Sequence, residues 1–280
     1  MSGTLYVVGT PIGNLGDITQ RQLEILGSVD FIAAEDTRVT RGLLTHFDLH
    51  TPLVSYHEHS PEGVIVRLAE RLLAGESCAV VTDAGMPCIS DPGALLVQRA
   101  IAEQIPVRVI PGPSAVISAL AVSGQDTGRF CFEGFLSVNK KQRHAHLESL
   151  RRETRTMVFY EAPHKLLNTL RDLYGAFGDR SVTLCRELTK IHEEVRKTTL
   201  AEAAAYYTEN APRGEFVLVI AGAPLDDASD ALSMESAVRA AQQRIAAGER
   251  AADVCREIAA ETGFPKRAIY QAVLSADETS

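Results

Sequence analysis

Short apolar runs rich in Val and Ile alternate with segments whose apolar residues recur at helical spacing. This alternation restricts the possible folds most, because strands that are apolar on both faces belong inside a sheet covered by helices. In the first part of the chain, the expected strands are Leu5–Val8, Phe31–Ala34, Leu53–Tyr56, Cys78–Thr82 and Val107–Ile110. Helical patterns at Val64–Leu73 and Ala94–Ala102 would cover the sheet. We therefore predict an α/β fold with a largely parallel sheet.

A second α/β series follows the glycine-bearing stretch Gly124–Gly128. Its expected strands are Phe130–Phe132, Thr156–Tyr160, Val182–Arg186, Val195–Thr198 and Phe216–Ile220. From about Met234 the chain is Ala-rich and typical of helices alone, with Gly263 ending one helix and Pro265 suited to the first turn of the next. We expect an N-terminal α/β domain over 1–123, a C-terminal α/β domain over 124–226 and a helical tail over 234–277.

The tail has the outline of a helix-turn-helix, with Lys266 and Arg267 at the start of its second helix. Many helical pairs of this kind never touch nucleic acid. Contact with RNA, a helical cap and a dimer contact all remain open for this segment.

The composition indicates a globular protein, since 280 residues with 45% hydrophobic content can bury the cores of two modest domains. No apolar run approaches the roughly 20 residues that span a bilayer, and Met1–Thr10 lacks the features of a signal peptide. We expect a cytoplasmic protein that binds no membrane. The five cysteines lack C-x-x-C spacing, and the His57–His59 cluster lacks H-E-x-x-H spacing, so we expect no metal.

The formal net charge of -8 argues against a protein that coats nucleic acid through bulk charge. An RNA substrate would need a local basic patch. One candidate patch comprises Lys140, Lys141, Arg143 and His144, followed by Arg151, Arg152 and Arg155.

Three glycine-bearing loops each follow an expected strand. In the first, Gly9–Gly16, the spacing matches neither a dinucleotide-binding loop nor a P-loop, and Asp17 with Gln20 would form a capping box. By itself this loop is as typical of a tight structural turn as of a ligand site.

The second loop, Thr82–Gly93, follows the apolar run Cys78–Val81, which belongs in the centre of the sheet, and so should lie at the crevice where α/β sheets hold ligands. Asp83 would face a ligand or bond turn amides, and Asp91 would cap the next helix. In the third loop, Pro111–Ala115, Ser114 would cap a helix or bond a ligand carboxylate. Convergence of the three loops on one rim predicts a small-molecule site.

Eight motifs in a fixed order make the chain similar to a known family. They are T-P-I-G-N-L-x-D-I-T at 10–19, A-E-D-T-R at 34–38, D-A-G-x-P at 83–87, D-P-G at 91–93, P-G-P-S-A at 111–115, F-Y-E-A-P-H at 159–164, R-E-L-T-K at 186–190 and G-E-F-V-L-V-I at 214–220. On these motifs the chain resembles the tetrapyrrole methylase superfamily over roughly residues 4 to 224, plus the helical tail. Met86 and Cys88 are a small departure from the pattern, with no consequence for any role.

The resemblance implies a two-domain α/β fold of the class III methyltransferase type, S-adenosylmethionine in the cleft between domains, and a homodimer. One subfamily of this kind methylates the ribose 2'-hydroxyl of a cytidine in the decoding region of 16S rRNA, with the assembled small ribosomal subunit as the expected partner.

The resemblance also implies which residues border the methyl donor. The expected contacts to the methyl donor are Gly9, Pro11, Asp83, Ala84, Gly85, Pro87, Ser90, Ser114, Ala115, Tyr160, Glu161 and Glu215.

A proton acceptor for the ribose hydroxyl would come from Glu35, Asp36 or Lys190, with Glu161 and Glu187 as further candidates. Expected RNA contacts are Arg38, Lys140, Lys141, Arg143, Arg186, Lys266 and Arg267. For any single charged residue, a salt bridge at the domain seam is an open alternative.

Three other functions remain open on the sequence alone. A corrinoid or porphyrin methylase would share the donor site, although the basic tract and the tail suit a large anionic partner better. A nucleotide-binding module without catalysis would prefer ATP or NAD to the methyl donor. A ribosome-assembly factor would bind small subunits without consuming a donor.

Overall fold

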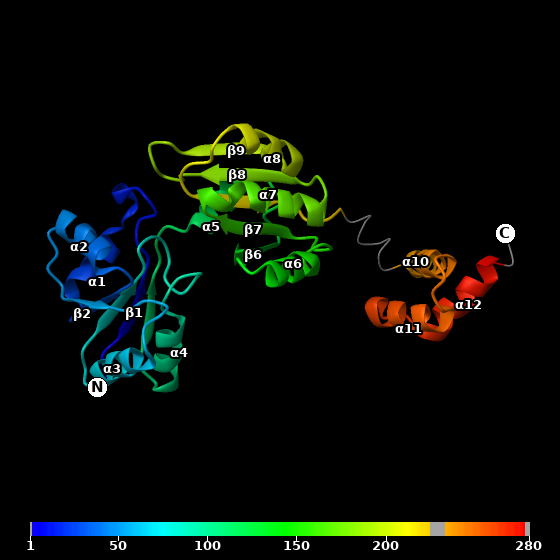
Figure 1. Ribbon diagram of the computed structural model, residues 1–280. Coiled ribbons are helices and arrows are strands. Elements are labelled where there is room, and N and C mark those ends of the chain that lie inside the picture. The colour runs from blue at the N-terminus through cyan, green and yellow to red at the C-terminus, as the bar shows by residue number, and fades with distance from the viewer. Residues whose placement is uncertain (1, 225–232, 278–280) are drawn as a thin grey trace.

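The computed structural model describes residues 2–224 and 233–277, with side chains as far as 274. Figure 1 shows two α/β units, one in blue to teal and one in green to yellow, and a set of helices at the C-terminal end. Within the described ranges, no helix is long and apolar enough to cross a membrane.

The first unit is built on a five-stranded sheet in the order β3-β2-β4-β1-β5, with every neighbouring pair parallel. Its strands are β1 (Leu5–Val8), β2 (Phe31–Ala34), β3 (Leu53–Ser55), β4 (Cys78–Val81) and β5 (Val107–Ile110). Every residue of β2 and β4 is buried, as their unbroken apolar sequences require. The predicted parallel sheet is confirmed.

Helices cover both faces of this sheet. They are α1 (Gln20–Ser28), α2 (Thr37–His46), α3 (Glu62–Leu73) and α4 (Ala94–Ala102). On one face, Leu72 of α3 and Leu96 of α4 belong to one buried cluster. On the other face, Leu26 of α1 and Leu44 of α2 belong to a second cluster. The carboxyl ends of the strands therefore remain the free edge on which a site can form.

The second unit also contains five strands, in the order β6-β7-β10-β8-β9. They are β6 (Phe130–Phe135), β7 (Thr156–Glu161), β8 (Ser181–Arg186), β9 (Glu194–Thr199) and β10 (Phe216–Ile220). Only β6 and β7 pair in parallel, and the other three pairs are antiparallel. This sheet is thus mixed, in contrast to the first.

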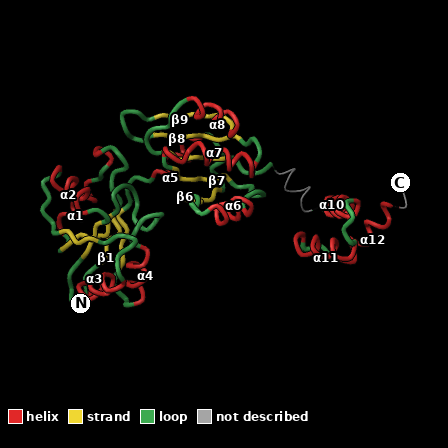
Figure 2. Tube along the Cα trace, viewed as in Figure 1, coloured by secondary structure: helices red, strands yellow, loops and turns green. Residues whose placement is uncertain are grey.

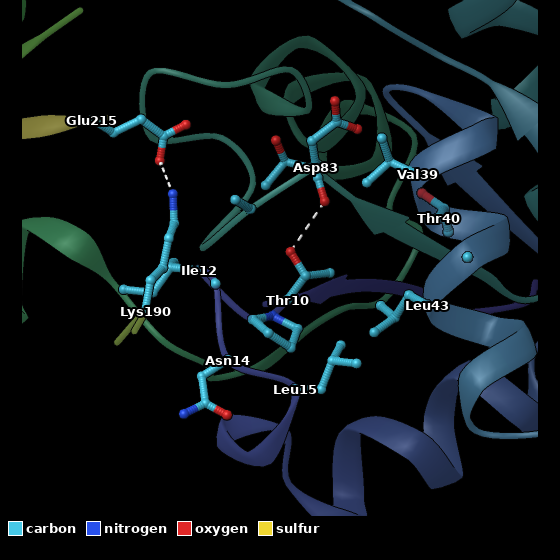
Figure 3. A pocket seen from close by; sticks show the side chains of 15 residues that line it. Thr10, Ile12, Asn14, Leu15, Val39, Thr40, Leu43, Asp83, Lys190 and Glu215 are labelled. Atoms are coloured by element: carbon cyan, nitrogen blue, oxygen red, sulfur yellow. Dashed lines mark hydrogen bonds and ion pairs between the residues drawn. The ribbon is translucent and has the colours of Figure 1, made fainter. Parts of the chain in front are cut away.

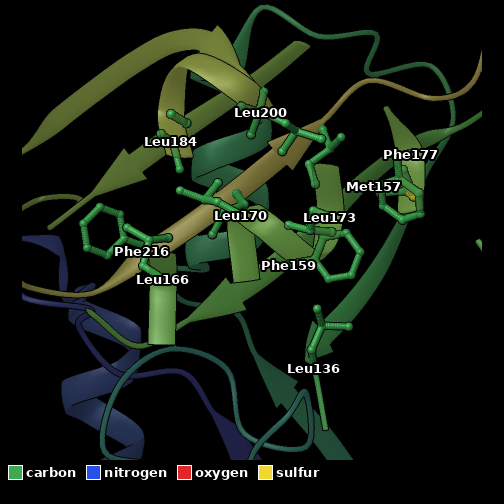
Figure 4. Packing of buried hydrophobic residues seen from close by; sticks show 14 of the residues in the cluster. Leu136, Met157, Phe159, Leu166, Leu170, Leu173, Phe177, Leu184, Leu200 and Phe216 are labelled. Carbon is green, nitrogen blue, oxygen red and sulfur yellow. The ribbon is translucent and has the colours of Figure 1, made fainter. Parts of the chain in front are cut away.

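The core of the second unit lies between its sheet and helix α7 (Pro163–Phe177), with α6 (Lys140–Ser149) and α8 (Leu200–Glu209) beside it. Leu166, Leu170 and Leu173 of α7 are fully buried against strand residues such as Phe159 (Figure 4). Figure 2 shows these helices in red around the yellow strands.

Helix α5 (Ala115–Ser123) covers the other face of the second sheet. Val116, Ala119 and Leu120 are buried with β8 and β10, although the expected domain boundary assigns this helix to the first domain. We therefore propose that the boundary lies at 111–114 in place of 123/124. The apolar content of α5 predicts a buried helix but does not indicate which sheet buries it.

The tail consists of α10 (Met234–Ala246), α11 (Ala251–Thr262) and α12 (Lys266–Asp277). Ala241, Val254, Ile258 and Ile269 are buried in a small core among these three helices. The predicted helical tail is confirmed. The part of the expected second domain at 225–226 lies outside the described residues.

The expected caps of two helices in the first unit, α1 and α4, are wrong. Helix α1 begins with a capping box of Thr19 and Gln22, while the expected Asp17 belongs to a short 3-10 helix, Leu15–Asp17. Helix α4 begins after Gly93, whose φ of 132° favours glycine, and has no side-chain cap, so Asp91 is not its cap. Gly93, two residues after Asp91, occupies the N-cap position in its place.

Candidate functional site

Two pockets adjoin at the carboxyl edge of the first sheet. The larger, of about 450 Å³, lies between the Ala84–Asp91 loop and the edge of the second sheet. Eight of the expected donor contacts line it: Ala84, Gly85, Ser90, Ser114, Ala115, Tyr160, Glu161 and Glu215. The glycine-bearing loops converge as predicted, and the second sheet forms the opposite wall of this pocket.

The smaller pocket, of about 350 Å³, lies beside α2 (Figure 3). Lys190 and Glu215 lie on one side, Val39 and Leu43 on the other, and Asp83 between them. Ile12, Ala84, Lys190 and Glu215 line both pockets. The two pockets therefore share a wall, and two bound molecules could meet across it.

Backbone contacts hold the three loops together. The Thr10 N–H donates to the Gly85 carbonyl at 2.9 Å, and the Gly85 N–H donates back to the Thr10 carbonyl at 3.1 Å. A Cβ on Gly9 would lie 2.8 Å from Cα of Gly112, so only glycines allow this approach. Of the other four expected donor contacts, Gly9 and Pro87 line neither pocket, and Pro11 and Asp83 line only the smaller one.

Lys190 stands at the shared wall and is held by two carboxylates. Its Nζ donates to Oε1 of Glu187 at 2.9 Å and to Oε2 of Glu215 at 3.0 Å, while its stem packs on Gly13. Partial burial opposes the charge, but the two hydrogen bonds raise the pKa of Lys190 above its ordinary value. The side chain is therefore an ammonium at neutral pH and is unsuited to the role of proton acceptor.

Glu35 and Asp36 contact the lining residues Thr82 and Asp83 but line neither pocket themselves. The Thr82 hydroxyl donates to Oε2 of Glu35 at 2.6 Å. Asp36 pairs with Arg38, and the hydrogen bond from the Arg38 side chain lowers the pKa of Asp36 to about 2. Both side chains are thus already engaged.

Asp91 is a half-buried carboxyl in the larger pocket that the sequence analysis did not assign to the site. Burial raises its pKa to about 6, and the charges of Glu35 and Asp83 act in the same direction. Burial, with the charge of Asp91, also raises the pKa of Tyr160 to about 12. A local signal was present, because Asp91 lies in a polar loop directly after a central strand.

Glu161 and Ser114 both line the larger pocket, and they differ in the hydrogen bonds that their side chains make within the protein. The Glu161 carboxylate is buried and accepts hydrogen bonds from the Ala162 N–H at 2.8 Å and from the Thr169 hydroxyl. Ser114 precedes α5 but makes no capping hydrogen bond, so the expected cap is wrong and, as far as the described residues go, its hydroxyl is available to a ligand.

Apolar lining residues were missed by the sequence analysis, most clearly Phe135. Strand β6 extends past its expected end at Phe132, and a bulge at Gly134 with a φ of 63° changes its register. Phe135 therefore reaches the larger pocket, 58% exposed, with its ring centroid 5.4 Å from that of Tyr160. A bulge of this kind leaves no pattern beyond a single glycine.

Four residues in the left-handed region flank the site. Cys88 and Ser90 have φ of 73° and 60°, and Glu187 and Thr189 have φ of 51° and 68°. Non-glycine residues adopt this conformation at an energetic cost, which contacts in the surrounding structure must offset. Its occurrence on both walls of the larger pocket is typical of a functional site.

None of the expected RNA contacts lines either pocket. Arg38 pairs with Asp36, Arg143 with Asp172 and Arg186 with Glu194. The remaining four are exposed at helix starts: Lys140 and Lys141 on α6, and Lys266 and Arg267 on α12.

Comparison with known proteins gives a consistent result. The family model of the tetrapyrrole (corrin/porphyrin) methylases matches residues 4–204. Ribosomal RNA small subunit methyltransferase I of Synechocystis sp. is 50% identical over 270 residues, which cover 96% of each chain. The protein of that name from Halalkalibacterium halodurans is 47% identical, over 96% of this chain and 93% of that one.

Solved structures share the fold. The methyltransferase CobJ superposes with a TM-score of 0.60 at 22% identity, covering 79% of this chain and 95% of that chain. Uroporphyrin-III-C-methyltransferase from Thermus thermophilus superposes with a TM-score of 0.56 at 19% identity, covering 78% of this chain and 94% of that chain. With the family model and the full-length relatives, these findings show that the chain belongs to the tetrapyrrole methylase family, in the group of ribosomal RNA small subunit methyltransferase I.

Proposed function

We propose that the chain is a cytoplasmic, homodimeric methyltransferase that transfers a methyl group from S-adenosylmethionine to the ribose 2'-hydroxyl of a cytidine in the decoding region of 16S rRNA. The observation that carries this proposal is the pair of adjoining pockets with a shared wall. A donor in one pocket and an acceptor in the other would meet there. The printed names of the relatives support an RNA of the small subunit as acceptor.

The larger pocket fits the methyl donor by its chemistry. Ile89 and Phe135 are exposed apolar side chains at this pocket and suit a purine ring. Asp91 and Glu161 supply carboxyl groups that suit a cation, and Ser114 supplies a hydroxyl. When bound, the donor supplies a methyl group carried on a positively charged sulfur.

The smaller pocket fits a nucleotide. Leu15, Val39 and Leu43 form an apolar side against which a base could lie, and Thr10 and Asp83 are polar groups suited to a ribose. These residues would hold the hydroxyl oxygen in line with the methyl group, and such positioning supplies most of the rate in a reaction whose leaving group departs neutral.

Recognition of the RNA must rely on surfaces outside the pockets. The chain carries a formal charge of -8, and the exposed Lys140, Lys141, Lys266 and Arg267 lie at helix starts away from the pocket linings. A folded particle that offers several spaced phosphates suits such dispersed cations better than naked RNA. We infer that the substrate is the assembled small subunit.

Transfer of labelled methyl tests this proposal. The protein is incubated with S-adenosylmethionine labelled in the methyl group and with small subunits from a strain that lacks the protein, naked 16S rRNA or a tetrapyrrole precursor. Digestion to nucleosides is expected to show the label in 2'-O-methylcytidine from the subunits. Label in the tetrapyrrole alone, or in a base in place of a ribose, would contradict the proposal.

A further inference from the structure

The proposed reaction releases the proton of a ribose hydroxyl, and the candidate acceptors from the sequence are poorly placed. Lys190 already holds its proton, and Glu35 and Asp36 line neither pocket. Within residues 2–224 and 233–277, the smaller pocket has two acidic side chains in its lining, Asp83 and Glu215. Glu215 is engaged by Lys190 at 3.0 Å, which leaves Asp83.

Backbone and side-chain contacts fix the pose of Asp83 at the end of β4. Its Oδ1 accepts a hydrogen bond from the Asp36 N–H at 3.0 Å. Its own N–H points to Oε2 of Glu35 at 3.4 Å, beside the Thr82 hydroxyl. In the part of the chain that the structure describes, Oδ2 of Asp83 accepts no hydrogen bond, so one oxygen is available to the pocket.

The surroundings of Asp83 favour proton uptake. Partial burial raises its pKa above the ordinary value, and the charges of Glu35 and Asp36 add to this effect. The charged groups that act on it or face it across the pocket are Glu35, Asp36, Arg38, Asp91, Lys190 and Glu215. Glu35 and Asp36 would thus act through Asp83, as positioning residues.

Resting on the function proposed above, we propose that Asp83 accepts the proton of the ribose 2'-hydroxyl during methyl transfer. The bond from oxygen to the methyl carbon forms as the bond from carbon to the sulfonium sulfur breaks. The electron pair of that bond stays on sulfur, which leaves as a neutral thioether, and the hydroxyl proton passes to Oδ2 of Asp83. The ammonium of Lys190, which has a third N–H to donate, stabilises negative charge on the attacking oxygen.

The test compares Asp83→Asn with Asp83→Glu and with a matched control, Asp48→Asn. The Asn variant keeps the oxygen that accepts from Asp36 but cannot take up a proton. Asp48 lines neither pocket, its side chain is 96% exposed, and its φ of 54° suits Asn as well as Asp. Donor binding by calorimetry, subunit binding by sedimentation, and titration of the Asp83 carboxyl by carbon-13 NMR provide readouts independent of turnover.

Asp83→Asn is expected to lower ribose methylation by about 100-fold or more, while donor and subunit affinities stay within about threefold of wild type. Asp83→Glu should retain more activity than the Asn variant, and Asp48→Asn should match wild type. The wild-type rate should fall with decreasing pH through the Asp83 pKa measured by NMR.

The role of Asp83 would be overturned if the Asp83→Asn variant methylated within about tenfold of wild type. It would also be overturned if the rate of that variant fell at low pH in the same way as the wild-type rate does. An equal loss of donor or subunit binding would also overturn it, because Asp83 would then act in binding. Absence of ribose label with the wild-type protein would instead refute the proposed function.

Discussion

Asp91 provides a direct test of the electrostatics of the larger pocket. Burial, reinforced by the charges of Glu35 and Asp83 and opposed by a hydrogen bond from Thr82, raises its pKa from 3.8 to about 6. The folded state therefore binds this proton more tightly than the unfolded state does. The resulting stabilisation is fully present below pH 3.8 and is lost as the pH rises through 6. An Asp91→Asn variant should escape this loss, because the amide stays neutral across this pH range.

The expected magnitude follows from the same pKa difference. The difference between a pKa of 3.8 and one of about 6 corresponds to ~3 kcal/mol, at about 1.36 kcal/mol per pKa unit. Since Asp91 is half-exposed, solvent screening reduces this figure to ~1 kcal/mol. Asp91→Asn should thus raise the free energy of unfolding by ~1 kcal/mol near pH 7.5 and leave it unchanged near pH 4.

Urea unfolding, followed by far-ultraviolet circular dichroism at both pH values, measures this difference. Asp48→Asn serves as the control, because Asp48 is exposed and distant in sequence from the pocket loops. An Asp91→Asn variant that is less stable than wild type at the higher pH, or that differs from it equally at both, would refute the reasoning.

Four further predictions concern the pockets and the core. Donor binding should release a proton near pH 6 and tighten as the pH rises, because a cation favours ionised Asp91; calorimetry in buffers of different ionisation enthalpy measures this, and Asp91→Asn should abolish it. Phe135→Ala should weaken donor binding about tenfold by removing an exposed aromatic face, and an unchanged Kd would contradict the assigned purine side. Gly13→Ala should lower Tm and methyl transfer, since its φ is 145° and its Cβ would lie 2.5 Å from Cγ of Lys190; Gly63→Ala, whose Cβ meets nothing within 4 Å, is the control. Leu170→Ala should lower the free energy of unfolding by ~2 to 5 kcal/mol in urea titrations, because Leu170 is fully buried.

The strands could be predicted because their signal is local. Runs such as Phe31–Ala34 and Cys78–Val81 are apolar throughout, and burial on both faces of a parallel sheet follows from that pattern alone. The direction of pairing in the second sheet could not be predicted, because it depends on contacts between segments far apart in the chain. For the same reason the sequence does not indicate that α5 packs on that sheet.

The pocket residues could be predicted from loops and motifs, but not their states. Ser114 was expected to cap α5, yet its helix begins without that hydrogen bond. Lys190 was a candidate base until its contacts with Glu187 and Glu215 were known. Charge states depend on which side chains meet in the folded chain, whereas identity as a lining residue follows from position after a strand.

The distribution of charge around the pockets constrains how the substrate arrives. Glu187 and Glu215 hold the ammonium of Lys190, and Asp83 and Asp91 line the same two pockets, so carboxylates outnumber cations around the shared wall. This field attracts a sulfonium cation but repels the phosphates that flank any target ribose. For the proposed reaction, contacts elsewhere must compensate for that repulsion, and the exposed cations of α6 and α12 are suited to do so. The affinity for small subunits should therefore fall with added salt while the affinity for the donor, bound inside the pocket, changes little.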